Sequence, residues 1–182
     1  AVPTQGLDRF WDEAARTALV SAYLAQTLGC VPKEDAHLFG LFRDAGIPLL
    51  MRRFSDYRDT LKLANSELTA SFTEIEDGRH GTNHAVVGGL LAKGWQLPDH
   101  IREAIGQHHD AGIYHSNLGS EAINLVAVGQ LAEYIESFYS RLSGNVEWEK
   151  HGPSVLAHLM LDQDQLEELS KDAKEMLEES GL

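Results

Sequence analysis

Five of the nine histidines lie in one stretch of the chain, between Glu76 and Asp110. Imidazoles that converge in one place can bind a metal ion or exchange protons near neutral pH. Helical spacing places one of them on a face made by His84, Gly88, Leu91 and Trp95. A second such face is made by Ile101, Ile105 and His108. Packing these faces together would bring His84 close to His108 or His109, which predicts a shared pocket.

Two helices must position these side chains. The first is predicted to begin near Thr82 or Asn83, either of which can cap a helix, and to run to about Trp95. The second is predicted over 98–108, because proline and an acidic residue are both favoured in a first turn. Gly88 and Gly89 each cost about 1 kcal/mol relative to alanine inside a helix. The usual compensation is close approach of a neighbouring helix, which we expect here.

Helical periodicity continues along the rest of the chain, and no alternating run of β-branched residues indicates a strand. Further helices are expected at about 7–28, 32–45, 48–54, 56–65, 119–142, 153–161 and 162–179. Residues 69–78 are expected to form short turns, and residues 141–152 a loop. The predicted fold class is therefore all-α, with one domain over residues 1–182.

Composition narrows the possible partners. The chain has 182 residues, a formal net charge of −13 and one cysteine, Cys30. This negative charge argues against nucleic acid as a partner and for solubility. A lone cysteine rules out an internal disulfide and suits a reducing compartment such as the cytoplasm. No run approaches the roughly 20 apolar residues of a membrane span, so no membrane partner is expected.

The spacing of the central stretch resembles that of the HDOD domain, the HD-related output domain of bacterial signalling proteins. The matching residues are Glu76-x4-Gly81-x2-His84-Ala85-x2-Gly88, Trp95-x-Leu97-Pro98 and His108-His109. Trp11 also matches, and residues 41–46 (Leu-Phe-Arg-Asp-Ala-Gly) are similar to the family's Leu-Leu-His-Asp-Ile-Gly. The resemblance covers nearly the whole chain from Leu7 and implies an HD-like helical bundle. It also implies that the family's N-terminal helical half would lie before Ala1, so that the chain is a piece of something longer.

In the HD superfamily, histidines and aspartates hold divalent ions that activate a water molecule for attack on a phosphate ester. The key His-Asp pair reads Arg43-Asp44 here, and arginine cannot bind a metal. Gln130, a poor ligand, stands at the position of the late aspartate, whereas Glu13 at the first-helix position could still bind a hard ion. The resemblance therefore implies a relic pocket, formed by Glu13, Arg43, Asp44, His84, His108, His109 and Gln130.

Two functions remain open. The first is a non-catalytic signalling module that acts on a protein partner or a neighbouring signalling domain, or holds a nucleotide in the relic pocket. The second is a metal-dependent phosphohydrolase, such as a cyclic-dinucleotide phosphodiesterase, with an altered ligand set. The replacements at Arg43 and Gln130 favour the first. No cofactor is expected; an adventitious divalent ion would have as ligands Asp44, His84, His108 and His109.

Each candidate also has a structural interpretation. His84 and His108 can be hydrogen-bonded interior histidines, and Arg43 can stabilise a helix C-terminus. Alternatively, Arg43 fills the metal position and pairs with Asp44 or Glu13. The amide of Gln130 needs a partner, which a histidine of the pocket or another helix could supply. Four further histidines are expected on the surface or in loops, namely His80, His100, His115 and His151.

Overall fold

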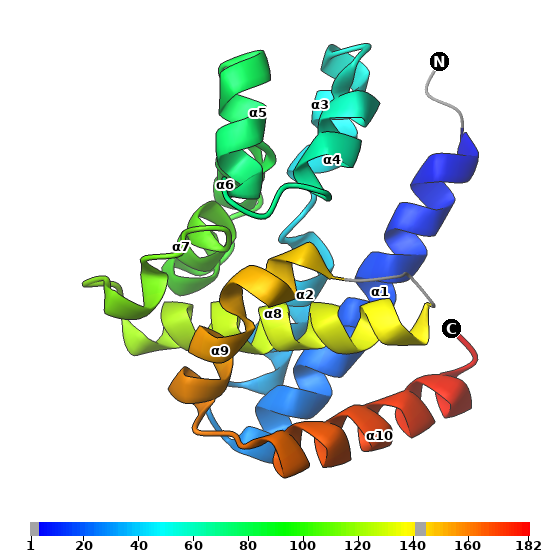
Figure 1. Ribbon diagram of the computed structural model, residues 1–182, viewed down its shortest axis with the longest axis vertical. Helices are drawn as coiled ribbons and strands as arrows, with labels where there is room; N and C mark the ends of the chain where they lie inside the picture. The colour runs from blue at the N-terminus through cyan, green and yellow to red at the C-terminus, as the bar shows by residue number, and fades with distance from the viewer. Residues whose placement is uncertain (1–3, 141–144) are drawn as a thin grey trace.

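The computed structural model describes residues 4–140 and 145–182, with side chains from residue 7 onward. Every regular element in these ranges is helical, which confirms the predicted all-α class. The helices in Figure 1 are α1 (Thr4–Leu28), α2 (Lys33–Phe42), α3 (Gly46–Arg53), α4 (Tyr57–Ala64), α5 (Phe72–His80), α6 (His84–Gly94), α7 (Asp99–Gln107), α8 (Ser120–Tyr139), α9 (Val146–Leu159) and α10 (Gln163–Ser180), with a single 3-10 turn, η1 (Ile113–His115). No described helix has the length and apolar character needed to cross a membrane.

Helix α8 forms the centre of the bundle and packs against α1, α2, α7, α9 and α10. Its buried residues, which include Leu125, Val128 and Leu131, are distributed around the whole helix. A helix that is apolar on nearly every side belongs in a core. Helices α3 to α6 project from this core at the top of Figure 1, and the candidate site lies where they join it.

Two glycines let neighbouring backbones approach at this junction. A Cβ atom on Gly88 of α6 would lie 3.0 Å from Cγ2 of Ile105 on α7, so the predicted close approach of these helices is present. A Cβ atom on Gly46, the first residue of α3, would lie 2.2 Å from the backbone carbonyl oxygen of His84. The start of α3 is therefore in direct backbone contact with the start of α6.

The start of α6 agrees with the prediction from sequence. Asn83 is the N-cap, and its side-chain oxygen accepts a hydrogen bond from the backbone N–H of Val86 at 2.9 Å. The prediction of short turns over 69–78 was wrong, because α5 is a regular helix from Phe72 to His80. Ser71 and Glu74 form a capping box at its N-terminus, which is a local signal that the sequence interpretation did not use.

The loop predicted over 141–152 is also wrong for its described part. Asn145 caps α9 by accepting a hydrogen bond from the backbone N–H of Trp148 at 2.9 Å, and Pro153 lies inside the helix instead of opening it. An interior proline costs about 3 kcal/mol. Packing reduces this cost: the indole ring of Trp148 stacks on Tyr134 of α8 at 4.2 Å between ring centroids, and such a pair contributes about 0.5–1.5 kcal/mol. Residues 141–144 lie outside the described residues.

Candidate functional site

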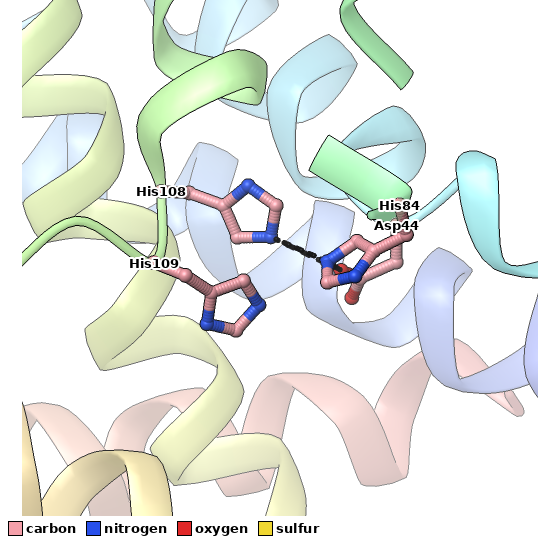
Figure 2. Close-up of side chains that lie close together, drawn as sticks. All are labelled: Asp44, His84, His108 and His109. Atoms are coloured by element: carbon pink, nitrogen blue, oxygen red, sulfur yellow. Dashed lines mark hydrogen bonds and ion pairs between the residues drawn. The ribbon is translucent and has the colours of Figure 1, made fainter. Parts of the chain in front are cut away.

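Four side chains from three parts of the chain converge at the junction of the core and the projecting helices. Asp44 follows α2, His84 opens α6, and His108 and His109 follow α7. Each offers one possible ligand atom, and these four atoms all lie within 4.8 Å of one another. The three histidines are buried, whereas a quarter of the Asp44 side chain is exposed (25%). Figure 2 shows the imidazole rings facing one another across this space.

Three of the ligand atoms form a small triangle. Nε2 of His84 lies 3.2 Å from Nε2 of His108 and 3.3 Å from Oδ1 of Asp44. The third side, from Nε2 of His108 to the same oxygen, is 3.2 Å. A tetrahedral ion with bonds of about 2.0–2.2 Å separates its nitrogen and oxygen ligands by about 3.3–3.6 Å. The triangle therefore fits a transition-metal ion such as zinc with little rearrangement.

The other ring nitrogen of each histidine is held from outside the triangle. The three Nδ1 contacts, each of 2.7 Å, are His84 to Glu76 Oε2, His108 to the carbonyl oxygen of Ile105, and His109 to Glu147 Oε2. Carboxylate and carbonyl oxygens only accept hydrogen bonds, so Nδ1 carries the hydrogen in every ring. This arrangement leaves Nε2 for a ligand and is typical of metal-binding histidines.

The protonation of the histidines differs. Burial opposes a charge on His84, but hydrogen bonds to Asp44 and Glu76 outweigh burial and raise the pKa of His84 to about 9. Burial and repulsion from His108 lower the pKa of His109 to about 3, despite its hydrogen bond to Glu147. At neutral pH, His84 is therefore an imidazolium between two carboxylates, and His109 is neutral.

The raised pKa of His84 predicts a loss of stability with increasing pH. The ion pairs of charged His84 stabilise the folded state fully below pH 6.5, the ordinary pKa of histidine. This stabilisation disappears as the pH rises through about 9. We expect the free energy of unfolding to fall by up to about 3 kcal/mol across this window. Urea denaturation in a chelator should measure it. His84→Gln should remove the decrease of stability with pH. His100→Gln, which changes the pair of His100 with Asp35, should keep it. An equal pH dependence in both variants would contradict the assignment of this effect to His84.

Arg43 occupies the outer side of Asp44. Its Nη2 atom lies 3.2 Å from Oδ2 of Asp44, and its Nη1 atom lies 2.9 Å from Oε2 of Glu133 on α8. Burial alone would lower the pKa of Arg43, but the charges of Asp44 and Glu133 outweigh it and raise the pKa above its usual value. The guanidinium group therefore stays charged. Glu13 is not its partner, because Glu13 pairs with Arg9 at 2.7 Å.

Gln130 does not contribute a ligand atom to the cluster. Its Nε2 atom donates to the backbone carbonyl of His108 at 2.8 Å, and its Oε1 atom accepts from the hydroxyl of Tyr114 at 2.6 Å. The partners considered from sequence included the side chains of His84 and His109, and neither of them forms this bond. Gln130 instead fixes the backbone that carries His108 and His109.

Two of the histidines expected on the surface or in loops are placed differently. His151 is buried within α9, and its Nε2 atom lies 3.5 Å from Oε2 of Glu147. His80 ends α5 and is partly buried; its ring stacks on Phe54, and its Nε2 atom lies 2.7 Å from the hydroxyl of Thr60. Sequence could not place either one, because their partners belong to other helices or to the segment predicted as a loop.

A cavity of about 460 Å³ opens beside the cluster. Its wall includes the relic-pocket residues Glu13, Arg43, Asp44, His84 and His109. Three further carboxylates line it, namely Glu133, Glu136 and Glu147. Acidic groups therefore outnumber Arg43 among the described residues of the wall.

The sequence analysis missed three residues that hold the side chains of the site, and it assigned no role to a fourth. Glu133 and Glu147 hold Arg43 and His109, and Tyr57 donates a hydrogen bond to Glu76. Glu76 stood in the sequence motif but received no role, although its carboxylate holds His84. The spacing of Glu76 was the signal that could have identified it; the other three act over long separations in sequence.

Comparison with known proteins fits this arrangement. The family model for the HDOD domain matches residues 3–111, which is more than half of the chain. This chain belongs to the HDOD family. No curated protein matches it significantly. The observed helical bundle agrees with this membership.

Two solved structures resemble this HDOD chain. One comes from Shewanella amazonensis SB2B and is described only provisionally as a phosphohydrolase; it has a TM-score of 0.66 and 20% identity, over 92% of this chain and 59% of its own. The other is the response regulator MmoQ from Methylococcus capsulatus strain Bath, with a TM-score of 0.55 and 19% identity, over 88% of this chain and 58% of its own. At such identities the likeness shows the fold alone, and the HDOD chain spans under two thirds of either structure.

Proposed function

We propose that this HDOD chain is a regulatory module that does not hydrolyse phosphodiesters. The ion pair of the buried Arg43 with Asp44 carries the proposal. Arg43 stands where the superfamily has a metal-binding histidine, and its fixed positive charge repels a cation at that position. Gln130 stands at the position of the late aspartate, and its amide forms hydrogen bonds with the backbone of His108 and the hydroxyl of Tyr114. Two ligands of the hydrolytic site are thus replaced by groups that bind the protein itself.

The remaining donors support the binding of one ion. Asp44, His84 and His108 would hold it, with His109 as the fourth ligand. When bound, such an ion supplies a Lewis acid that can lower the pKa of a water molecule. The protein residues meanwhile fix the junction of α2, α6 and α7, because the ligands come from the ends of these helices. In the proposed function, occupancy of the site sets how firmly this junction is held.

Signalling would then proceed by contact with a protein partner or a neighbouring domain in the cytoplasm. The same fold occurs in a response regulator, MmoQ. A nucleotide in the cavity is less favoured than a protein contact, because carboxylates dominate the described wall and Arg43 is already paired with two of them.

A metal-dependent phosphohydrolase is the second candidate. The triangle of ligand atoms favours it, since its dimensions fit an ion. The similar structure described as a phosphohydrolase is consistent with this candidate. The two candidates differ in whether a bound ion leads to turnover.

An assay of metal-loaded protein separates them. Elemental analysis should first measure bound manganese, iron and zinc. The loaded protein is then incubated with cyclic di-GMP, linear dinucleotides and nucleotides, beside an Asp44→Ala, His84→Ala double variant. We expect no turnover above this variant. Multiple turnovers that are lost in the double variant would establish the hydrolase instead. Arg43→His combined with Gln130→Asp should raise metal affinity, because both restore ligands.

A further inference from the structure

A chain of buried polar groups leads from the cluster into the projecting helices. Glu76 of α5 has no exposed surface, and neither do Tyr57 of α4 and His84. The carboxylate of Glu76 lies 2.7 Å from Nδ1 of His84 and 3.3 Å from the backbone nitrogen of the same residue. It also accepts a hydrogen bond from the hydroxyl of Tyr57. A buried carboxylate is costly unless donors surround it, so its retention here needs a reason.

The directions of these bonds supply that reason. Glu76 can only accept from Nδ1, which places the hydrogen of the neutral ring there and leaves Nε2 for the triangle. The bond to the backbone N–H of His84 ties the same carboxylate to the first residue of α6. Tyr57 on α4 donates to Oε1 of Glu76, whereas Nδ1 of His84 on α6 contacts Oε2, so the carboxylate is held by two helices at once.

We propose that Glu76 is a positioning residue for an ion at the cluster, acting through His84, and that Tyr57 holds Glu76 in place. This inference rests on the single-ion donor set of the proposed function. Its consequence is that ion affinity depends on the hydrogen bonds of Tyr57 on α4 and Glu76 on α5, although neither helix contributes a ligand. An amide at position 76 could instead donate to Nδ1, and the hydrogen would then move to Nε2 and block the ligand position.

The chain offers a matched control for helix packing. Thr60 of α4 lies 2.7 Å from Nε2 of His80 on α5, so this pair joins the same two helices as Tyr57 and Glu76. Neither Thr60 nor His80 belongs to the four-residue cluster. Thr60→Val therefore loosens the contact between α4 and α5 without changing any bond to His84.

The test titrates the full chain with cobalt(II) and follows the visible absorption of the bound ion, with zinc measured by competition. Glu76→Gln should weaken both ions by about 10- to 100-fold and shift the cobalt bands. Tyr57→Phe should weaken them by a smaller factor. Thr60→Val should leave both affinities and the spectrum unchanged. Circular dichroism in a chelator checks that each variant is folded.

Several outcomes would overturn the proposal. Unchanged affinity in Glu76→Gln would do so, as would an equal loss in Thr60→Val or a wild-type chain that binds no cobalt at the cluster. If Glu76→Gln does not fold, Tyr57→Phe decides, because it removes one hydroxyl and keeps the ring: a loss of affinity supports the proposal, and no loss overturns it. Phosphodiester turnover is a separate readout, so failure of the regulatory function is distinguishable from failure of this positioning role.

Discussion

Arg43→Ala is expected to destabilise the fold by about 3 kcal/mol, the lower end of the cost of breaking a buried ion pair from one side, because the carboxylates left behind are 25% and 31% exposed. The side chain of Arg43 is only 7% exposed, and its guanidinium neutralises both Asp44 and Glu133. Removing it leaves Glu133 without its cation and Asp44 with the imidazolium of His84 alone. The free energy of unfolding from urea denaturation should show the loss directly.

A surface pair in the same molecule provides the control. Arg9 and Glu13 form an ion pair one helical turn apart, and the Arg9 side chain is 64% exposed. Exposed pairs of this kind contribute about 0.3–0.5 kcal/mol, so Arg9→Ala should be nearly neutral. The explanation given for Arg43 fails if the two alanine variants lose similar stability.

Gly46→Ala is expected to cost about 3 kcal/mol or more, at or above the usual upper range for overpacking. The added Cβ would lie 2.2 Å from the carbonyl oxygen of His84, and it would also lie 2.9 Å from the carbonyl carbon. Both atoms belong to the backbone, so no side-chain rotation can relieve the overlap. Helix α3 or helix α6 must shift, and the ring of His84 then moves relative to Asp44, which lies two residues before Gly46.

Two measurements test this prediction. Thermal unfolding should show a large decrease in stability for Gly46→Ala, and the affinity for cobalt should fall because His84 moves. Gly78→Ala is the matched control: Gly78 lies within α5, and a Cβ there meets nothing within 4 Å. Alanine should stabilise that helix by up to about 1 kcal/mol. An unchanged melting curve for Gly46→Ala would show that α3 and α6 do not touch as described.

Sequence predicted those parts of the fold whose signals are local. Asn83 marks the start of α6 through a bond to a residue three positions away. Apolar residues at helical spacing also predicted the long α8, although its buried residues lie all around the helix and not on one face. The sequence prediction failed at α9, because Pro153 suggested the start of a helix. The stack that helps to stabilise α9 involves Tyr134, which belongs to another helix. Local signals therefore predict ordinary helices, but not a helix such as α9 that contains a proline and is stabilised by contacts with another helix.

The candidate site follows the same division. The family spacing brought attention to Asp44, His84, His108 and His109, which the structure brings together. It did not reveal the partners of these residues. Glu147 holds His109 from 38 positions away, and Glu133 holds Arg43 from 90 positions away. Such pairs depend on how the helices cross, which a single sequence does not specify.

The distribution of the cluster along the chain has a consequence for folding. His84 and His108 are 24 positions apart, and Asp44 and His108 are 64 apart. An ion held by all three is therefore a reversible cross-link that closes two long loops, in a chain whose single cysteine can form no internal disulfide. Ion concentration then sets the strength of this link: at 100 times the dissociation constant, it adds about 2.7 kcal/mol to the stability. Under the proposed function, the chain would therefore have a cross-link that the ion content of its environment can insert or withdraw.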